Sequence, residues 1–239
     1  MAVEFTPDHH GGSGPPLVLI HGFTDTWATW ELVIPRLERD FEVLAVTMPG
    51  HAGGPPVSGP ITADTLPDGV AAALDEAGFE SAHLAGNSLG GFVALQLATR
   101  GRALSVTGLA PAGGWSQEFQ EVHALDYFIT QQDQVKKAAP YADRIASTPE
   151  GRRQATRLIV EDPSLITPAM VVHQLLGAAS CPAALPMIEF ARREGYELEP
   201  SRIDCPVRIL WGTEDRLLRW PSTAIRFREE WCPRRSTSN

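Results

Sequence analysis

Short apolar runs alternate with amphipathic stretches along most of the chain. Runs of consecutive apolar residues that end in glycine, proline or polar turns predict five buried strands. These runs cover residues 17–20, 41–46, 81–84, 104–109 and 207–211. Apolar residues at helical spacing predict helices over residues 27–37, 66–77 and 90–99. This alternation predicts an α/β fold, in which helices flank both faces of a mostly parallel sheet.

The long stretch between the fourth and fifth predicted strands has a different pattern. Apolar residues recur at helical spacing in residues 118–130, 151–160, 168–177 and 186–194, and prolines separate these segments. No strand pattern interrupts them. We therefore predict that residues 114–201 form a helical cap over the carboxyl edge of the sheet. Residues 1–113 and 202–239 would form the core, and cap and core would fold as one unit.

Composition narrows the class of protein and its partners. A chain of 239 residues is long enough for one sizeable domain, and its formal net charge of -9 disfavours nucleic acid or an anionic membrane as partner. The N-terminus lacks the basic and apolar pattern of a secretory signal, and no stretch is apolar enough to cross a bilayer. The cysteines at positions 181, 205 and 232 are widely spaced, which favours reduced thiols. We expect a cytoplasmic protein that binds a small-molecule substrate; its oligomeric state stays open.

One short motif carries chemistry. Residues 86–90 read Gly-Asn-Ser-Leu-Gly, follow a predicted strand and precede a predicted helix. This is the setting of a nucleophile elbow, a tight turn that lifts a serine hydroxyl above the sheet. Glycines at both ends remove clashes in the turn. We predict that Ser88 is a nucleophile and that the backbone N–H of Leu89 lies near a helix N-terminus, where it can stabilise negative charge.

Two further segments fit the same chemistry. His21-Gly22-Phe23 follows the first predicted strand, so that the Phe23 N–H and the Leu89 N–H would together form an oxyanion hole. Trp211-Gly212-Thr213-Glu214-Asp215 follows the last predicted strand. A carboxylate there can orient a catalytic imidazole and stabilise its cation. Both segments also fit plain turns, a strand-ending glycine turn and a solvated acidic turn.

These segments, in this order, resemble the α/β-hydrolase superfamily over about residues 17–231. The resemblance is nearest to small capped esterases, carbon–carbon bond hydrolases and cofactor-free haloperoxidase-like members. It implies no cofactor and no metal, and it favours Asp215 over Glu214 as the acid. It implies hydrolysis of a small carboxylic ester, or of a related acyl or carbon–carbon bond, through an acyl-enzyme on Ser88. The serine disfavours the dehalogenase and epoxide-hydrolase branches, which use aspartate at the elbow.

The family's catalytic histidine has no counterpart, because no histidine follows Asp215. His9 and His10 lie in a polar, Gly-rich leader that is predicted to be a tail. The remaining histidines precede Asp215 in the chain, which is not the family's order, at positions 21, 51, 83, 123 and 173. We therefore expect impaired activity. A truncated or frame-shifted gene product is the favoured explanation; an inactive ligand-binding relative and an unusual base are the others.

Two alternative functions stay open at this stage. The chain could be a non-catalytic protein that binds a small ligand beneath the cap, or a cofactor-free haloperoxidase-like enzyme that uses the same residues. The cap carries no motif that names a substrate. Its aromatic residues are candidate pocket liners, although they equally fit a plain core: Trp115, Phe119, Tyr127 and Phe128.

Overall fold

A six-stranded sheet organises the protein, described here from a computed structural model for residues 3–115 and 125–231. The strands are β1 (Asp8–Gly12), β2 (Pro16–Ile20), β3 (Glu42–Val46), β4 (Ala82–Asn87), β5 (Ala103–Leu109) and β6 (Val207–Leu210). Their order across the sheet is β1-β3-β2-β4-β5-β6. Only β1 runs antiparallel to its neighbour; the remaining pairs are parallel. This arrangement confirms the predicted α/β fold.

Helices cover both faces of the sheet, which explains why β2 and β3 are buried almost throughout. On one face α2 (Thr65–Glu76) and α3 (Leu89–Thr99) pack against Val18, Ile20 and Leu84 in the main core. The other face buries a smaller cluster around Leu17 and Val43. That cluster contacts the 3₁₀ turn Trp27–Trp30 and the short helix α1 (Ile34–Leu37).

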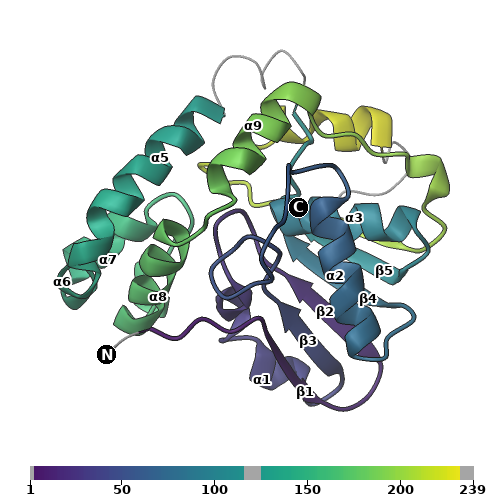
Figure 1. Ribbon diagram of the computed structural model, residues 1–239, viewed down its shortest axis with the longest axis horizontal. Helices are drawn as coiled ribbons and strands as arrows, with labels where there is room; N and C mark the ends of the chain where they lie inside the picture. The colour runs from purple at the N-terminus through teal and green to yellow at the C-terminus, as the bar shows by residue number, and fades with distance from the viewer. Residues whose placement is uncertain (1–2, 116–124, 232–239) are drawn as a thin grey trace.

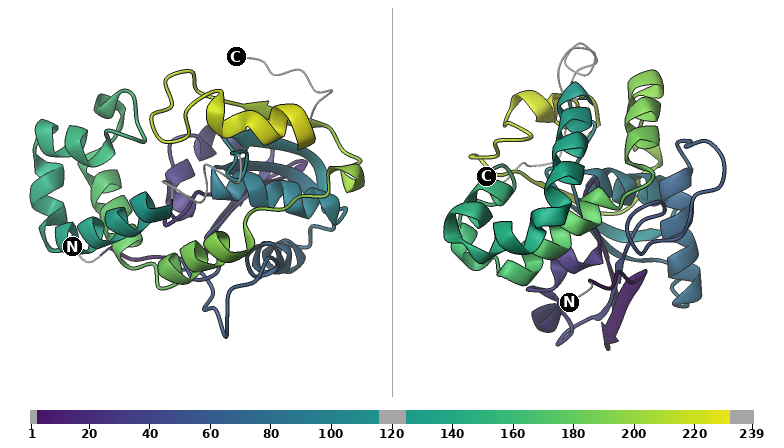
Figure 2. Two further views of the ribbon diagram at one scale, coloured as in Figure 1. Left: turned by 90° about the horizontal axis from the view of Figure 1, so that it is seen from above. Right: turned by 60° about the vertical axis from the view of Figure 1, so that its left-hand side comes forward.

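Helices also fill the long connection between β5 and β6 where the structure describes it (Figure 1). They are α5 (Leu125–Ala138), α6 (Ala142–Ser147), α7 (Pro149–Thr156), α8 (Pro168–Ala179) and α9 (Ala184–Glu194). Short 3₁₀ turns occur at Ala139–Tyr141, Pro163–Leu165, Pro200–Arg202 and Ser222–Ala224, and Phe227–Trp231 forms a π-helical turn. Helices α5 to α8 gather to one side of the sheet, and α9 crosses above it (Figures 1 and 2).

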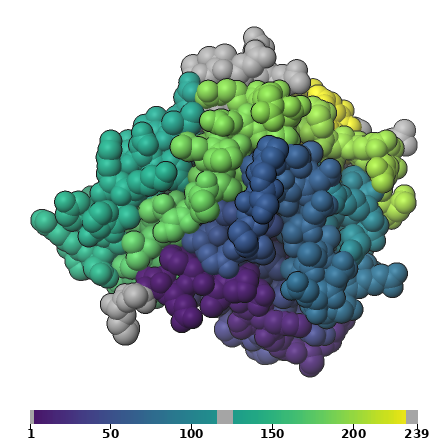
Figure 3. Space-filling model, in the orientation of Figure 1, coloured from purple at the N-terminus to yellow at the C-terminus, as the bar shows by residue number. Residues whose placement is uncertain are grey.

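The space-filling view shows how these segments share one face of the molecule (Figure 3). The teal and green helices form its left and upper part, and the purple and blue N-terminal residues form its lower part. Among the described residues, no single helix is long and apolar enough to cross a membrane; only α8 and α9, taken together across a 64° bend, have that length and composition.

Two local predictions are wrong. The polar leader is not a tail, because residues 8–12 form β1, where His9 and His10 contact Glu38 and Glu42. The predicted helix over residues 27–37 is divided into a 3₁₀ turn and one α-helical turn. In each case backbone pairing or tertiary packing overrides a weak local pattern.

Candidate active site

Ser88 stands at a sharp turn between β4 and α3. Its backbone has φ 51° and ψ -117°, a conformation that strains any residue with a side chain. Hydrogen bonds hold the turn on both sides: the Ser88 N–H donates to Leu109 O at 2.9 Å, and the Ser88 carbonyl accepts from Ala112 N at 2.9 Å. The strain therefore persists because neighbouring strands fix the backbone around it.

The two glycines of the motif allow three segments to meet at this turn. A Cβ atom on Gly86 would lie 2.6 Å from Gly91 N, and one on Gly90 would lie 2.6 Å from the carbonyl carbon of Ile20. Both neighbours are backbone atoms, which cannot rotate away. Gly22 also approaches the turn, because its Cβ would lie 3.5 Å from the Ser88 Cβ. The predicted oxyanion loop and Ser88 are thus in contact.

His21 fixes the backbone that precedes Phe23. Its Nε2 accepts a hydrogen bond from Met48 N at 2.9 Å, so its Nδ1–H donates to Gly22 O at 2.7 Å. Complete burial and the neighbouring His51 ring lower the pKa of His21 well below its usual value, which keeps the imidazole neutral. The loop continues through Thr24, which has φ 61°. His21 therefore holds the loop in shape.

Asp215 organises the turn that follows β6. Its Oδ1 accepts two backbone hydrogen bonds, from Leu217 N at 2.9 Å and Leu218 N at 2.7 Å. The Trp211 indole N–H donates to Leu218 O at 2.6 Å and closes the same turn. Among the described residues, no hydrogen bond reaches the second carboxylate oxygen. Asp215 is only partly exposed, whereas Glu214 is exposed.

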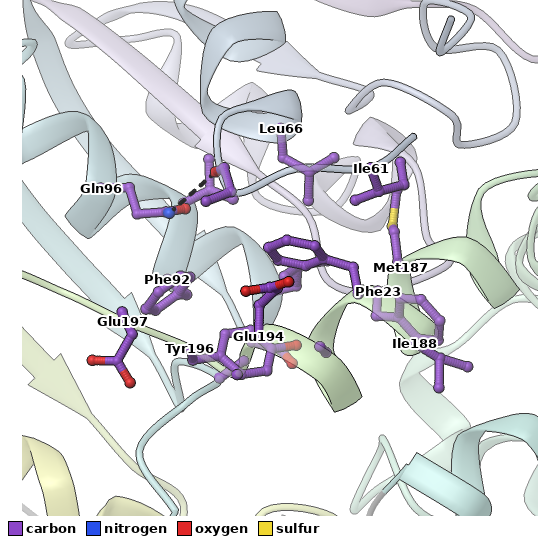
Figure 4. A pocket seen from close by; sticks show the side chains of 18 of the residues that line it. Phe23, Ile61, Leu66, Phe92, Gln96, Met187, Ile188, Glu194, Tyr196 and Glu197 are labelled. Carbon is purple, nitrogen blue, oxygen red and sulfur yellow. Dashed lines mark hydrogen bonds between the residues drawn. The ribbon is translucent and has the colours of Figure 1, made fainter. Parts of the chain in front are cut away.

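Ser88 lines two neighbouring cavities. The larger, which we call the apolar cavity, has a volume of about 530 Å³ and lies against α2, α3, α9 and the residues that follow α9. Figure 4 shows Phe92 and Gln96 toward one end of it and Met187 and Ile188 toward the other. The smaller, which we call the acid cavity, has a volume of about 310 Å³ and contains Ser88 and Asp215 in its walls.

The cavities place the predicted site residues in two groups. Ser88, Leu89 and Phe23 line the apolar cavity, and Ser88 and Asp215 line the acid cavity. Of the predicted pocket liners, Trp115 and Phe128 line the apolar cavity, Tyr127 does not, and Phe119 lies outside the described residues. Sequence reasoning missed Tyr196, which follows α9. The one feature of the sequence that could have indicated Tyr196 is an aromatic residue just beyond an amphipathic helix.

No histidine of the described residues lines either cavity. His51 is buried, its Nδ1–H donates to Pro49 O at 3.1 Å, and burial lowers its pKa to about 4. His83 contacts Ser105 Oγ at 2.8 Å, and His173 of α8 contacts Thr26 Oγ1 at 2.9 Å. His123 lies outside the described residues. These contacts hold the rings of His51, His83 and His173 in the packing, outside both cavities.

The part of the chain that the structure describes contains no cluster of metal-binding side chains. No group of three histidine, cysteine, aspartate or glutamate side chains lies close enough together there to hold an ion. The polar and charged residues that line the acid cavity with Ser88 are Asn87, Arg157, Glu161, Glu214, Asp215 and Arg216. They offer hydrogen-bond donors and acceptors and charges of both signs.

Comparison with known proteins adds a family match. A model of the alpha/beta hydrolase family matches residues 17–236. An epoxide hydrolase from Mycobacterium tuberculosis is 36% identical over 154 residues, which are 64% of this chain and 72% of that protein. A pimeloyl-[acyl-carrier protein] methyl ester esterase from Aeromonas hydrophila is 42% identical over 89 residues, which are 36% of this chain but only 33% of that protein.

A solved structure shares the fold across nearly the whole chain. A meta-cleavage product hydrolase from Pseudomonas fluorescens superimposes with a TM-score of 0.64 at 23% sequence identity. The superposition covers 90% of this chain and 79% of the hydrolase chain. At 90% coverage the fold similarity takes in most of the helices between β5 and β6, whereas the sequence match to the Aeromonas esterase spans 36% of this chain.

Proposed function

The chain belongs to the alpha/beta hydrolase family, and on that premise we propose that it is a serine hydrolase of small carboxylic esters or related acyl or carbon–carbon bonds, with Ser88 as its nucleophile. The observation that carries the proposal is the strained turn at Ser88, at the junction of an apolar cavity and a cavity that contains a carboxylate. Residues 114–201 would act as a cap whose helix α9 closes the apolar cavity.

The proposed reaction forms and then hydrolyses an ester on Ser88. The Ser88 Oγ attacks the substrate carbonyl carbon and its proton leaves to a base. The carbonyl oxygen becomes an oxyanion, which accepts hydrogen bonds from the backbone N–H groups of Phe23 and Leu89. The tetrahedral intermediate expels the alcohol, which takes up a proton. Water then attacks the acyl-enzyme, and its collapse releases the acid and restores the hydroxyl.

The described residues supply no general base for Ser88. Asp215 would orient an imidazole, but no histidine follows it in the sequence and none of the described residues supplies one in the acid cavity. The proton must then leave to water or to a base from solution. Loss of one member of a catalytic triad can cost about a million-fold in turnover in a serine protease. We therefore propose that the turnover of this chain is strongly impaired.

We do not propose epoxide hydrolysis, the activity in the name of the mycobacterial relative, for this chain. Opening an epoxide by way of an ester intermediate requires a carboxylate nucleophile, and residue 88 is a serine. A serine hydroxyl forms such an ester only with an acyl group. The proposed substrates are therefore carbonyl compounds.

A second candidate function is non-catalytic binding of a small apolar ligand. The apolar cavity favours it, because a volume of about 530 Å³ lined by aromatic and aliphatic side chains binds ligands without any nucleophile. This candidate and the hydrolase share the cavity and differ only in what Ser88 does.

Turnover of p-nitrophenyl acetate separates the two. We expect slow turnover above the rate in buffer, abolished in Ser88→Ala and unchanged in Ser222→Ala, a serine on an exposed turn. Equal rates for the parent chain and Ser88→Ala would reject the hydrolase proposal and leave the binding protein as the better account.

A further inference from the structure

Tyr196 presents a hydroxyl to the apolar cavity from a rigid support. Its ring packs edge-on against Phe92 and Trp115, with centroids 5.0 Å and 5.3 Å away. Its backbone carbonyl accepts a hydrogen bond from Arg226 Nη1 at 2.7 Å. The residue lines the apolar cavity and is only partly exposed. The phenol ring therefore has little freedom to turn away.

The hydroxyl of Tyr196 is left for a ligand. Among the described residues, no hydrogen bond to it is formed. Burial raises the pKa of Tyr196 to about 12, so the group keeps its proton at any pH at which the protein is handled. A protonated phenol with no protein partner inside an apolar cavity is a donor for an oxygen atom that the ligand brings.

Charge at the cavity rim selects against one class of ligand. The rim carries the carboxylates of Asp64, Glu194 and Glu197, and Arg193 is the cation that lines it with them. Arg193 Nε donates to Glu194 Oε1 at 2.8 Å, so that Arg193 partners this carboxylate and not Asp64 or Glu197. The latter two pair with Arg100 and Arg226. The carboxylates of these two pairs are exposed, and ion pairs at the surface reduce the field only in part.

We propose that Tyr196 is a specificity residue, and that the apolar cavity takes an uncharged, mainly apolar substrate with a second oxygen that accepts the Tyr196 hydroxyl hydrogen bond. The second oxygen is an ether or ketone oxygen apart from the reacting carbonyl. This substrate class rests on the proposed function. The interaction itself is one of binding and does not require Ser88 to react.

Binding in the Ser88→Ala chain tests the proposal without catalysis. The probes share one shape: 4-phenylbutan-2-one carries the oxygen, n-butylbenzene lacks it, and 4-phenylbutanoate carries a negative charge. We expect the ketone to bind most tightly by calorimetry. Tyr196→Phe should weaken ketone binding about three- to tenfold, the usual range for one neutral hydrogen bond, and leave n-butylbenzene unchanged. Tyr141→Phe, at a tyrosine that is 59% exposed, is the control and should change neither.

The charge at the rim has its own variant. Glu194→Gln should narrow the difference in affinity between the ketone and 4-phenylbutanoate, whereas Glu199→Gln, at an exposed residue that does not line the cavity, should leave it unchanged. Equal ketone affinity with and without the Tyr196 hydroxyl, or an equal loss for n-butylbenzene, would overturn the role of Tyr196. Tighter binding of 4-phenylbutanoate than of the ketone would overturn the substrate class. Failure of Ser88 to react in the parent chain would leave these affinities intact and count only against the hydrolase proposal.

Discussion

Replacement of Gly90 by alanine tests whether the turn at Ser88 depends on close backbone approach. The added Cβ would lie 2.6 Å from the Ile20 carbonyl carbon, and closer still to the carbonyl oxygens of Ile20 and His21. Carbon atoms in ordinary contact are about 3.5 Å apart, so the start of α3 would have to move by about 1 Å. The neighbours are backbone atoms of a central strand, and they cannot yield by a change of rotamer.

The expected loss of stability follows from two opposing contributions. Alanine gains at most about 1 kcal/mol over glycine in a helix, and less in the first turn, where Gly90 lies. Overpacking of a rigid site costs about 1–3 kcal/mol or more. We expect Gly90→Ala to lower the free energy of unfolding by about 2 kcal/mol, and to lower Tm by about 4–8 °C for a chain of this size.

Urea unfolding followed by circular dichroism measures this difference, with Gly212→Ala as the matched control. A Cβ on Gly212 would lie 3.8 Å from its nearest neighbour, Asp215 N, in ordinary contact. We expect that control to change the free energy by less than about 0.5 kcal/mol. If Gly90→Ala were as stable as Gly212→Ala, the close approach of α3 to β2 would be refuted.

Three further predictions concern strain, acid and base. Ser88→Gly should raise Tm by about 2–4 °C, because glycine relieves strain of about 1–3 kcal/mol at φ 51° and loses about 0.5–1 kcal/mol of chain entropy, whereas Ser88→Ala keeps the strain and should leave Tm unchanged. Stability should fall from pH 7 to pH 5, because the lowered pKa values of His21 and His51 leave them neutral when folded while the unfolded chain binds protons below about pH 6.5. Burial raises the pKa of Asp25 to about 6, so the folded chain binds a proton there between pH 7 and pH 5, which opposes the loss of stability. Asp25→Asn should therefore deepen the fall in the free energy of unfolding by about 1 kcal/mol, measured by urea titrations at the two pH values. A shallower fall in the variant would contradict the argument. Free imidazole at tens of millimolar should speed p-nitrophenyl acetate turnover by about tenfold beyond its effect on Ser88→Ala, because the acid cavity can admit a base between Ser88 and Asp215, and Asp215→Asn should reduce that gain.

The sheet could be predicted from the sequence because each buried strand corresponds to a short run of apolar residues. Residues 17–20 illustrate this: four apolar positions in a row require cover on both faces, and the structure supplies it. The antiparallel β1 could not be predicted in this way, since Asp8, His9 and His10 carry no apolar pattern. That strand forms because its backbone pairs with β3, and this pairing cannot be predicted from the types of its residues.

The site divides along the same line. Ser88 could be predicted because glycines at fixed spacing encode a turn, and the position of Asp215 because it lies in a turn that follows a strand at the edge where ligands gather. Tyr196 could not, because its place in the apolar cavity depends on how the chain leaves α9 and packs against Phe92 and Trp115. Long-range packing of this kind leaves no local signature in the sequence.

Covalent capture by a fluorophosphonate probe, read by intact mass and peptide mapping, tests the role of Ser88 most directly. The account predicts one phosphonyl adduct on Ser88 that forms slowly in buffer, forms faster when imidazole is added, and is absent from Ser88→Ala. No adduct on the folded parent chain even with imidazole, or an adduct that persists in Ser88→Ala, would contradict it.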